Sequence, residues 1–174
     1  MRRKSLAIGM AFAAVLAAVS LSARAGDDED EVNPAALAKA LSKASVSLEQ
    51  GLKASESEGQ PISGKFEGSD GALQLSVYTM KGGQFAEVLV DHDSGSIRNS
   101  EPITDPDDLK DAKEQGEAMG KAKLSLAEAV ASAVKANNGF RAVSAVPMLD
   151  GGQPVASVTL IDGGEVKKIT EKLD

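Results

Sequence analysis

The segment LVDHDSGSI, residues 89–97, brings two aspartates, a serine and the chain's only histidine together within nine residues. Such side chains build hydrolase sites and calcium loops, and they also favour tight turns. A serine two residues from its histidine cannot easily present its hydroxyl to the ring, and the chain has no second histidine. A calcium loop starting at Asp91 would need a glutamate where Pro102 stands. The sequence therefore predicts a turn in which Gly95 takes a positive φ, with weak calcium binding left open.

Paired glycines are the second pattern that could do chemistry, because glycine-rich loops can cradle phosphates. They occur at residues 82–83, 151–152 and 163–164, without a following helix pattern or Lys-Ser/Thr pair. Hairpin turns are the simpler interpretation. None of the 26 acidic residues lies in an apolar context, although an unrecognised carboxylate pair stays an alternative. We therefore expect a non-catalytic protein and assign no catalytic, cofactor-binding or metal-binding residue.

The first 25 residues have the pattern of a secretory signal peptide. Three basic residues at positions 2–4 precede an apolar run over residues 6–21, and Ala23-Arg24-Ala25 offers a cleavage site. The apolar run is shorter than the ~20 residues of a spanning helix, which makes an uncleaved anchor the weaker alternative. We expect general secretion with cleavage near Ala25, a periplasmic or secreted protein, and no stable membrane insertion of the mature chain.

The charge and composition of the mature chain limit the classes of partner that it can bind. Removing residues 1–25, which hold four basic groups and no acid, changes the formal charge from −7 to −11. An acidic surface repels phosphate groups, and four remaining aromatic residues are too few for a base-stacking platform, so nucleic acid is not an expected partner. The absence of cysteine excludes disulfides, thiol catalysis and thiolate metal sites. Packing alone must stabilise this fold.

After the cleavage site, residues 26–33 form an acidic leader that we expect to be disordered. Asn33-Pro34 then resembles a helix start, with an N-cap residue followed by proline. The apolar residues that follow share one helical face (Leu37, Leu41, Ala44, Leu48 and Leu52). The pattern does not decide between one helix and two helices joined near Ser45.

Two capping boxes indicate an internal repeat. Ser47 with Gln50, and Ser125 with Glu128, have the spacing at which side chains and backbone N–H groups bond reciprocally at a helix start. After each predicted helix the apolar period changes to two, and a double glycine turns the chain into a further strand. The helix starts are offset by 78 residues and the strand pairs by 81. A matched capping box and double glycine favour duplication over chance.

The sequence therefore predicts an α+β fold of two tandem repeats. Each repeat is a short helix followed by an antiparallel β-meander, over residues 34–97 with a preceding helix and over residues 122–174. Residues 98–121 are expected to form a linker with a short exposed helix that starts at Asp105-Pro106. Repeats of this size approach the lower limit for independent folding, so we expect them to pack as one compact unit.

These motifs resemble the PepSY domain family, whose usual signature is a Ser-Leu-x-x-Ala helix start and a closing V-D-x-x-x-G. The first copy has Ser47-Leu48 and Val90-Asp91 with Gly95, and the second has Ser125-Leu126 with Glu128-Ala129. Together the two copies cover residues 46–97 and 124–174. Gly51 departs from the usual alanine, and the second copy stops at Asp174 before a closing V-D-x-x-x-G.

The resemblance implies a non-catalytic extracytoplasmic module, found in propeptides of secreted metallopeptidases and in small exported proteins, and proposed to restrain peptidase activity. We therefore expect a protein partner, with a peptidase as one candidate, and no inhibitory residue can be carried over. A partner strand could add to the sheet near residues 62–67 or 84–90. The alternative is an acidic cation-binding or structural envelope protein that uses residues 27–31 and 105–108.

Overall fold

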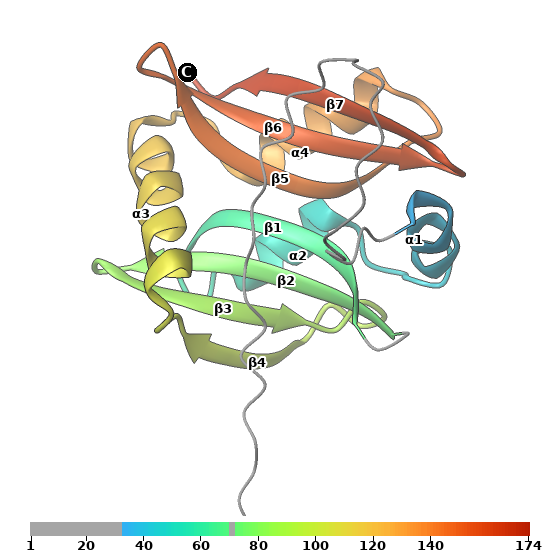
Figure 1. The fold of residues 1–174 in the computed structure, drawn as a ribbon, viewed down its shortest axis with the longest axis horizontal. Helices are drawn as coiled ribbons and strands as arrows, with labels where there is room; N and C mark the ends of the chain where they lie inside the picture. Colours follow the sequence, from blue (N-terminus) through green and yellow to red (C-terminus); the bar gives the residue numbers. More distant parts are fainter. Residues whose placement is uncertain (1–32, 70–71) are drawn as a thin grey trace, which may run out of the picture.

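The computed structural model describes residues 33–69 and 72–174 (Figure 1). The predicted signal peptide and residues 26–32 of the predicted leader lie outside the described residues. Four helices and seven strands occur in the described part. In chain order they are α1 (Pro34–Leu41), α2 (Leu48–Ser55), β1 (Gln60–Ser69), β2 (Ala72–Lys81), β3 (Gln84–Val90), β4 (Ile97–Pro102), α3 (Pro106–Lys121), α4 (Leu126–Ala136), β5 (Arg141–Asp150), β6 (Gln153–Asp162) and β7 (Glu165–Lys172). No helix of this described part is both long enough and apolar enough to cross a lipid bilayer.

The seven strands form one antiparallel sheet in the order β4-β3-β2-β1-β5-β6-β7. The predicted α+β class is therefore confirmed. We call α1 to β4 the first half and α3 to β7 the second half. The halves join where β1 meets β5, through the pairs Gly64↔Ala145 and Lys65↔Ser144. The prediction that residues 62–67 or 84–90 form a sheet edge is wrong, because β1 and β3 each have a strand on both sides.

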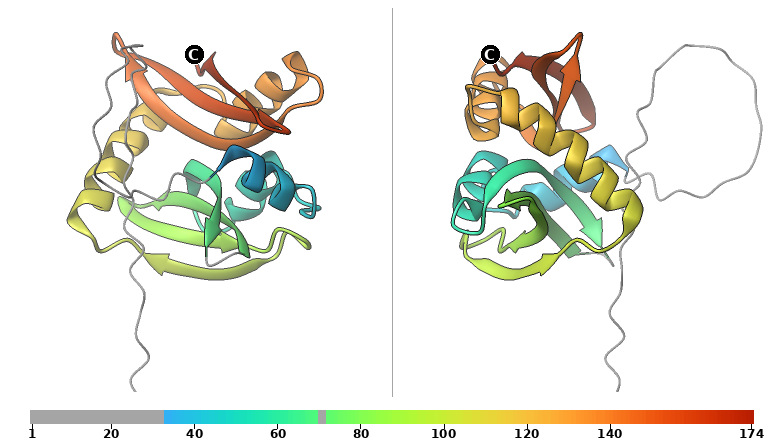
Figure 2. Two further views of the ribbon diagram at one scale, coloured as in Figure 1. Left: turned by 45° about the vertical axis from the view of Figure 1, so that its right-hand side comes forward. Right: turned by 90° about the vertical axis from the view of Figure 1, so that its left-hand side faces the viewer.

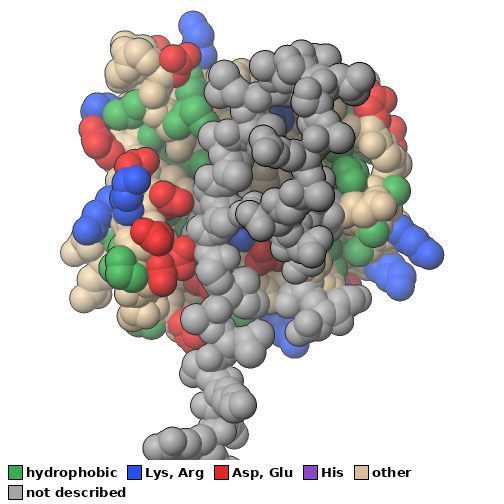
Figure 3. Space-filling view, viewed as in Figure 1, with side chains coloured by type: hydrophobic (Ala, Val, Ile, Leu, Met, Phe, Trp, Pro, Cys, Tyr) green, Lys and Arg blue, Asp and Glu red, His purple; other side chains and the backbone are tan. Residues whose placement is uncertain are grey.

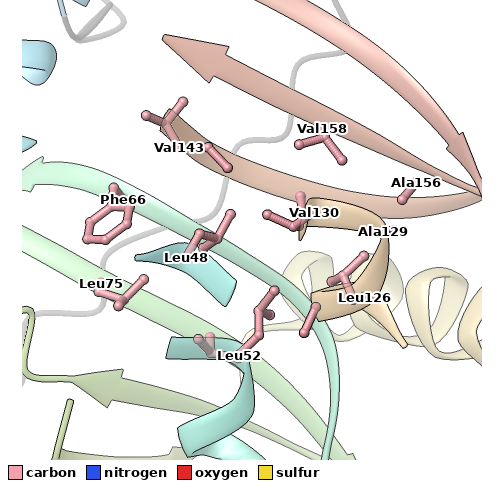
Figure 4. Packing of buried hydrophobic residues seen from close by; sticks show 14 of the residues in the cluster. Leu48, Leu52, Phe66, Leu75, Leu126, Ala129, Val130, Val143, Ala156 and Val158 are labelled. Carbon is pink, nitrogen blue, oxygen red and sulfur yellow. The ribbon is translucent and has the colours of Figure 1, made fainter. Parts of the chain in front are cut away.

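Helices α2 and α4 lie side by side against one face of the sheet (Figures 1 and 2). Their apolar faces meet the strands of both halves, so a single core spans the junction between β1 and β5 (Figure 4). The largest fully buried side chains come from both halves (Leu41, Leu48, Leu52, Ile62, Leu75, Val77, Val88, Leu126, Val130, Val158, Leu160 and Leu173). The expectation of one compact unit is thus met by a shared core.

The helix starts follow the predicted capping chemistry. The Asn33 side chain accepts from the backbone N–H groups of Ala35 and Ala36 and opens α1. Both capping boxes are present, with Ser47 at the start of α2 and Ser125 at the start of α4. Because α1 ends at Leu41 and α2 begins at Leu48, the apolar stripe that left two possibilities open belongs to two helices.

Helix α3 is longer and more buried than the short exposed helix predicted for residues 98–121. It has 16 residues, and β4 precedes it in the same segment. Its buried face consists of small residues, one methionine and one glutamine (Ala112, Gln115, Gly116, Ala118 and Met119), which give a weak hydrophobic signal in the sequence. Gln115 accepts from the buried Ser63 hydroxyl at 2.7 Å. Acidic and basic side chains are interspersed on the outward surface of α3 (Figure 3).

Helix α2 comes unusually close to β2 at Gly51. A Cβ atom built on Gly51 would lie 2.6 Å from Cδ2 of Leu75, a buried side chain with no exposed area. Alanine at this position would therefore displace Leu75. This contact gives a physical reason for glycine at this position of α2.

Candidate functional site

The turn after β3 is organised by one carboxylate. Oδ1 of Asp91 accepts from the backbone N–H groups of Asp93 (3.1 Å) and Ser94 (2.8 Å) and from the Ser94 hydroxyl (3.0 Å). Two backbone bonds close the turn, from Gly95 N to Asp91 O and from Asp91 N to Ser96 O, both 2.8 Å long. Gly95 has φ of +76°. The predicted turn is confirmed, including its glycine.

These hydrogen bonds set the charge state of Asp91. The bond from the Ser94 backbone, followed by the Ser94 hydroxyl and the Asp93 backbone, holds the pKa of the Asp91 carboxyl below its ordinary value. The carboxylate is therefore ionised at neutral pH and is engaged by N–H and O–H donors. Its role is to stabilise the backbone rather than to act as a base.

His92 contributes to the fold through its backbone. Its carbonyl accepts from two consecutive N–H groups, those of Ser45 (3.0 Å) and Val46 (2.9 Å), which lead into α2. The ring is partly exposed, and its Nδ1 lies 3.1 Å from an oxygen of Asp93. Because the Ser94 hydroxyl donates to Asp91, the turn does not form a serine–histidine pair.

The second half has a closely similar device at its own helix entry. The Leu173 carbonyl accepts from the consecutive N–H groups of Lys123 (2.6 Å) and Leu124 (3.1 Å), which lead into α4. The residue that supplies this carbonyl follows β7, as His92 follows β3. The same backbone geometry is thus reached with leucine in place of histidine, so it does not require an imidazole.

Arg141, at the start of β5, adds a feature that sequence reasoning missed. Its guanidinium donates to three backbone carbonyls of the first half, those of Leu41, Ala44 (3.3 Å) and Val46 (3.3 Å). A planar guanidinium has five N–H donors and can engage several acceptors at once. The signal that could have found Arg141 is the 81-residue offset, which aligns it with the uncharged Gln60.

The sheet face opposite α2 and α4 carries a polar network on β1, β2 and β3. Lys65 pairs with Glu67 at 2.7 Å, and Glu67 also accepts from Gln74 and Ser76, each at 3.3 Å. Each of these side chains has a partner, so the network supplies no unpaired base.

Tyr78 lies in the same face and donates to Glu87 at 3.3 Å. Burial, and then the negative charges of Glu87 and Glu67, raise the pKa of the Tyr78 phenol. The phenol is therefore neutral at neutral pH. It acts as a hydrogen-bond donor within the sheet rather than as a nucleophile.

The free edges of the sheet are β4 and β7. A two-residue hairpin makes Asp162↔Glu165 a hydrogen-bonded pair, so alternate residues of β7, including Lys168 and Thr170, direct their N–H groups away from β6. On β4, the bond from Ile103 N to Phe85 O fixes the alternation, and the outward positions are Ser100 and Pro102. Because proline has no N–H, β4 offers fewer outward donors than β7.

Among the described residues, no three or more His, Asp or Glu side chains are grouped so that they could hold a metal ion. Of the two acidic runs, residues 27–31 lie outside the described part. In the other, Oδ1 of Asp105 accepts from the N–H groups of Asp107 (2.9 Å) and Asp108 (3.3 Å) and caps α3. Asp105 therefore acts as the N-cap of α3.

No family model, no curated protein and no solved structure matches this chain. The case for any function therefore comes from the residues and the geometry described above.

Proposed function

We propose that this chain is an exported, non-catalytic PepSY-like protein of the cell envelope. It binds a protein partner, and the partner class that we propose is a peptidase whose activity it restrains. One observation carries the proposal: in the segment with the richest catalytic composition, the Asp91 carboxylate and the His92 carbonyl are engaged in holding the backbone. The function that we propose is therefore recognition of a partner through the protein surface rather than catalysis.

The tandem repeat belongs to the same proposal, and strand register supports it. Gln60 pairs with Met80 in the first half, and Arg141 pairs with Ile161 in the second, so both partners of each pair differ by 81 residues. Each first strand has a register shift at the matching place, between Pro61 and Ser63 and between residues 142 and 144. Register shifts at matching places support a duplication, because bulges are specific, retained features.

We place the partner's contact on the free edge of β7. This edge is eight residues long and presents alternate N–H groups away from β6, which is the arrangement that an added strand requires. Lysines such as Lys168 protect an edge from random pairing and favour a partner strand with acidic side chains. The β4 edge has six residues and ends at Pro102, which has no N–H, so it serves as the control.

A pull-down from envelope extract tests the proposal, with the mature chain as bait. Thr170→Pro removes one outward N–H of β7, and Ser100→Pro removes one from β4, so the two variants match in chemistry. We expect the wild-type and Ser100→Pro baits to retain the same protein and Thr170→Pro to lose it. Thr170→Val, which keeps the N–H, should retain it. Equal retention by all four baits would refute the contact at β7.

The peptidase step has a separate measurement. The captured protein is assayed for cleavage of a casein substrate with increasing amounts of the wild-type chain and of Thr170→Pro. Saturable inhibition by the wild type alone is the expected result. Capture of a protein without proteolytic activity would retain the binding function and reject peptidase restraint.

A further inference from the structure

The segments that enter α2 and α4 share a set of backbone hydrogen bonds. We call residues 41–46 the first entry loop and residues 119–124 the second entry loop. The carbonyl of the first residue accepts from the N–H three positions later in both, at 3.0 Å and 3.2 Å. The last two N–H groups of each loop share one carbonyl, that of His92 or Leu173. The two loops therefore present their carbonyl groups in corresponding positions.

Among the described residues, a cationic side chain donates hydrogen bonds to these carbonyls only in the first entry loop. Arg141 donates to the carbonyls of the first, fourth and sixth residues of that loop. At the position 81 residues earlier the chain has Gln60, an exposed and uncharged residue whose side chain makes no hydrogen bond within the described residues. The corresponding residues of the second entry loop are Met119, Ala122 and Leu124, and no described side chain donates to their carbonyls.

A cavity of about 300 Å³ lies beside the second entry loop. All three corresponding residues of the second entry loop line it, and so does Gln60. Leu124 is 41% exposed, which is high for a large apolar side chain, and it forms part of the wall. A side chain with a cationic end and an apolar stem fits such a wall.

We propose that this cavity binds the guanidinium group of an arginine side chain from a protein partner. Met119, Ala122 and Leu124 supply the acceptors, as the corresponding carbonyls do for Arg141. The carbonyls at the end of α3 carry partial negative charge, and Glu56 in the cavity wall adds a full one. Lys123 also lies in the wall and opposes this attraction, so the contact depends on the full set of guanidinium N–H donors as well as on charge.

The inference rests on the proposed function only in assigning the arginine to a protein partner. The cavity itself is tested without any partner. The full chain, labelled with ¹⁵N, is titrated with N-acetyl-arginine methylamide, and the backbone amide shifts of residues 122–125 are followed by NMR. The neutral isostere N-acetyl-citrulline methylamide is the matched ligand.

Two variants complete the design. Gln60→Arg supplies the guanidinium from within the chain, in the way that Arg141 does for the first entry loop, and Gln60→Met leaves the cavity open without a charge. We expect saturable shifts with the arginine ligand at a Kd on the order of millimolar, which is typical of a single side-chain contact. The citrulline ligand should give at least tenfold weaker binding. Gln60→Met should retain saturable binding of the arginine ligand, and Gln60→Arg should lose that binding and raise Tm.

Three results would overturn the inference. These are equal shifts with the arginine and citrulline ligands, arginine binding that persists in Gln60→Arg, and no saturation with the wild type. None of these results depends on the β7 edge, so the pull-down with Thr170→Pro tests the proposed function separately.

Discussion

Replacing Arg141 by glutamine makes the first entry loop resemble the second, and the size of the effect follows from three hydrogen bonds. Hydrogen bonds to charged groups each contribute ~1.5–3 kcal/mol, but two of these three are 3.3 Å long and the guanidinium is only partly buried. We therefore expect Arg141→Gln to lower the free energy of unfolding by ~2–3 kcal/mol. For a protein of this size, that corresponds to a Tm decrease of roughly 5–10 °C.

Thermal unfolding followed by circular dichroism measures the Tm, and native-state hydrogen exchange shows where the loss occurs. The amides of Ser45 and Val46, which donate to His92, should exchange faster in Arg141→Gln, whereas the amides of Lys123 and Leu124 should not change. Arg141→Lys keeps the charge but not the fork, so it should recover less than half of the lost stability. A Tm within about 1 °C of the wild type, or uniform exchange in both loops, would refute this role of Arg141.

Three further predictions concern the helices and the sheet. Ser47→Ala and Ser125→Ala should both lower Tm at neutral pH, but only the effect of Ser125→Ala should shrink in acid. Hydrogen bonds from Ser125 lower the pKa of Glu128 in the second box, so the stability that Glu128 contributes is present above its ordinary pKa and is lost as pH falls through the lowered pKa. The first box has Gln50, which does not titrate. Measurements of Tm from pH 2 to 7 distinguish the two variants. Tyr78, the only tyrosine, should show no phenolate absorbance at 295 nm until the protein unfolds. Because the pKa of Tyr78 is raised in the folded protein, the free energy of unfolding should fall as pH rises above ~10. Phenolate absorbance from the folded protein at pH 11 would contradict this prediction. Gly51→Ala should lower the free energy of unfolding, measured in urea, by ~1 kcal/mol, since overpacking against Leu75 exceeds the gain in helix propensity. Adding Leu75→Val to the same chain should remove most of that loss. A Gly51→Ala variant that is more stable than the wild type would contradict the close contact.

Local chemistry made several elements predictable from the sequence. The two capping boxes placed the starts of α2 and α4, because a Ser-x-x-Glu/Gln spacing satisfies backbone donors wherever a helix begins. The double glycines placed the β2–β3, β5–β6 and β6–β7 hairpin turns, and the positive φ of Gly82, Gly151 and Gly163 shows why. The turn at Asp91 was also predictable, because its hydrogen bonds stay within five residues.

Contacts between distant residues were not predictable in the same way. The pairing of β1 with β5 joins residues about 80 positions apart, and no local period encodes it, so β1 was mistaken for an edge. The bond from Arg141 to the Leu41 carbonyl joins residues 100 positions apart. The buried face of α3 escaped notice because alanine and glycine carry little hydrophobic signal.

Photo-crosslinking in living cells tests partner binding at β7 most directly. A photoreactive benzoylphenylalanine is placed at Lys168, an exposed residue of β7, and in a separate chain at Ser100, the exposed counterpart on β4. Adducts are isolated from the cell envelope and identified by mass spectrometry. Our account predicts one dominant protein adduct from position 168, with a protease as its identity, and none from position 100. Equal adducts from both positions, or none from either, would contradict it.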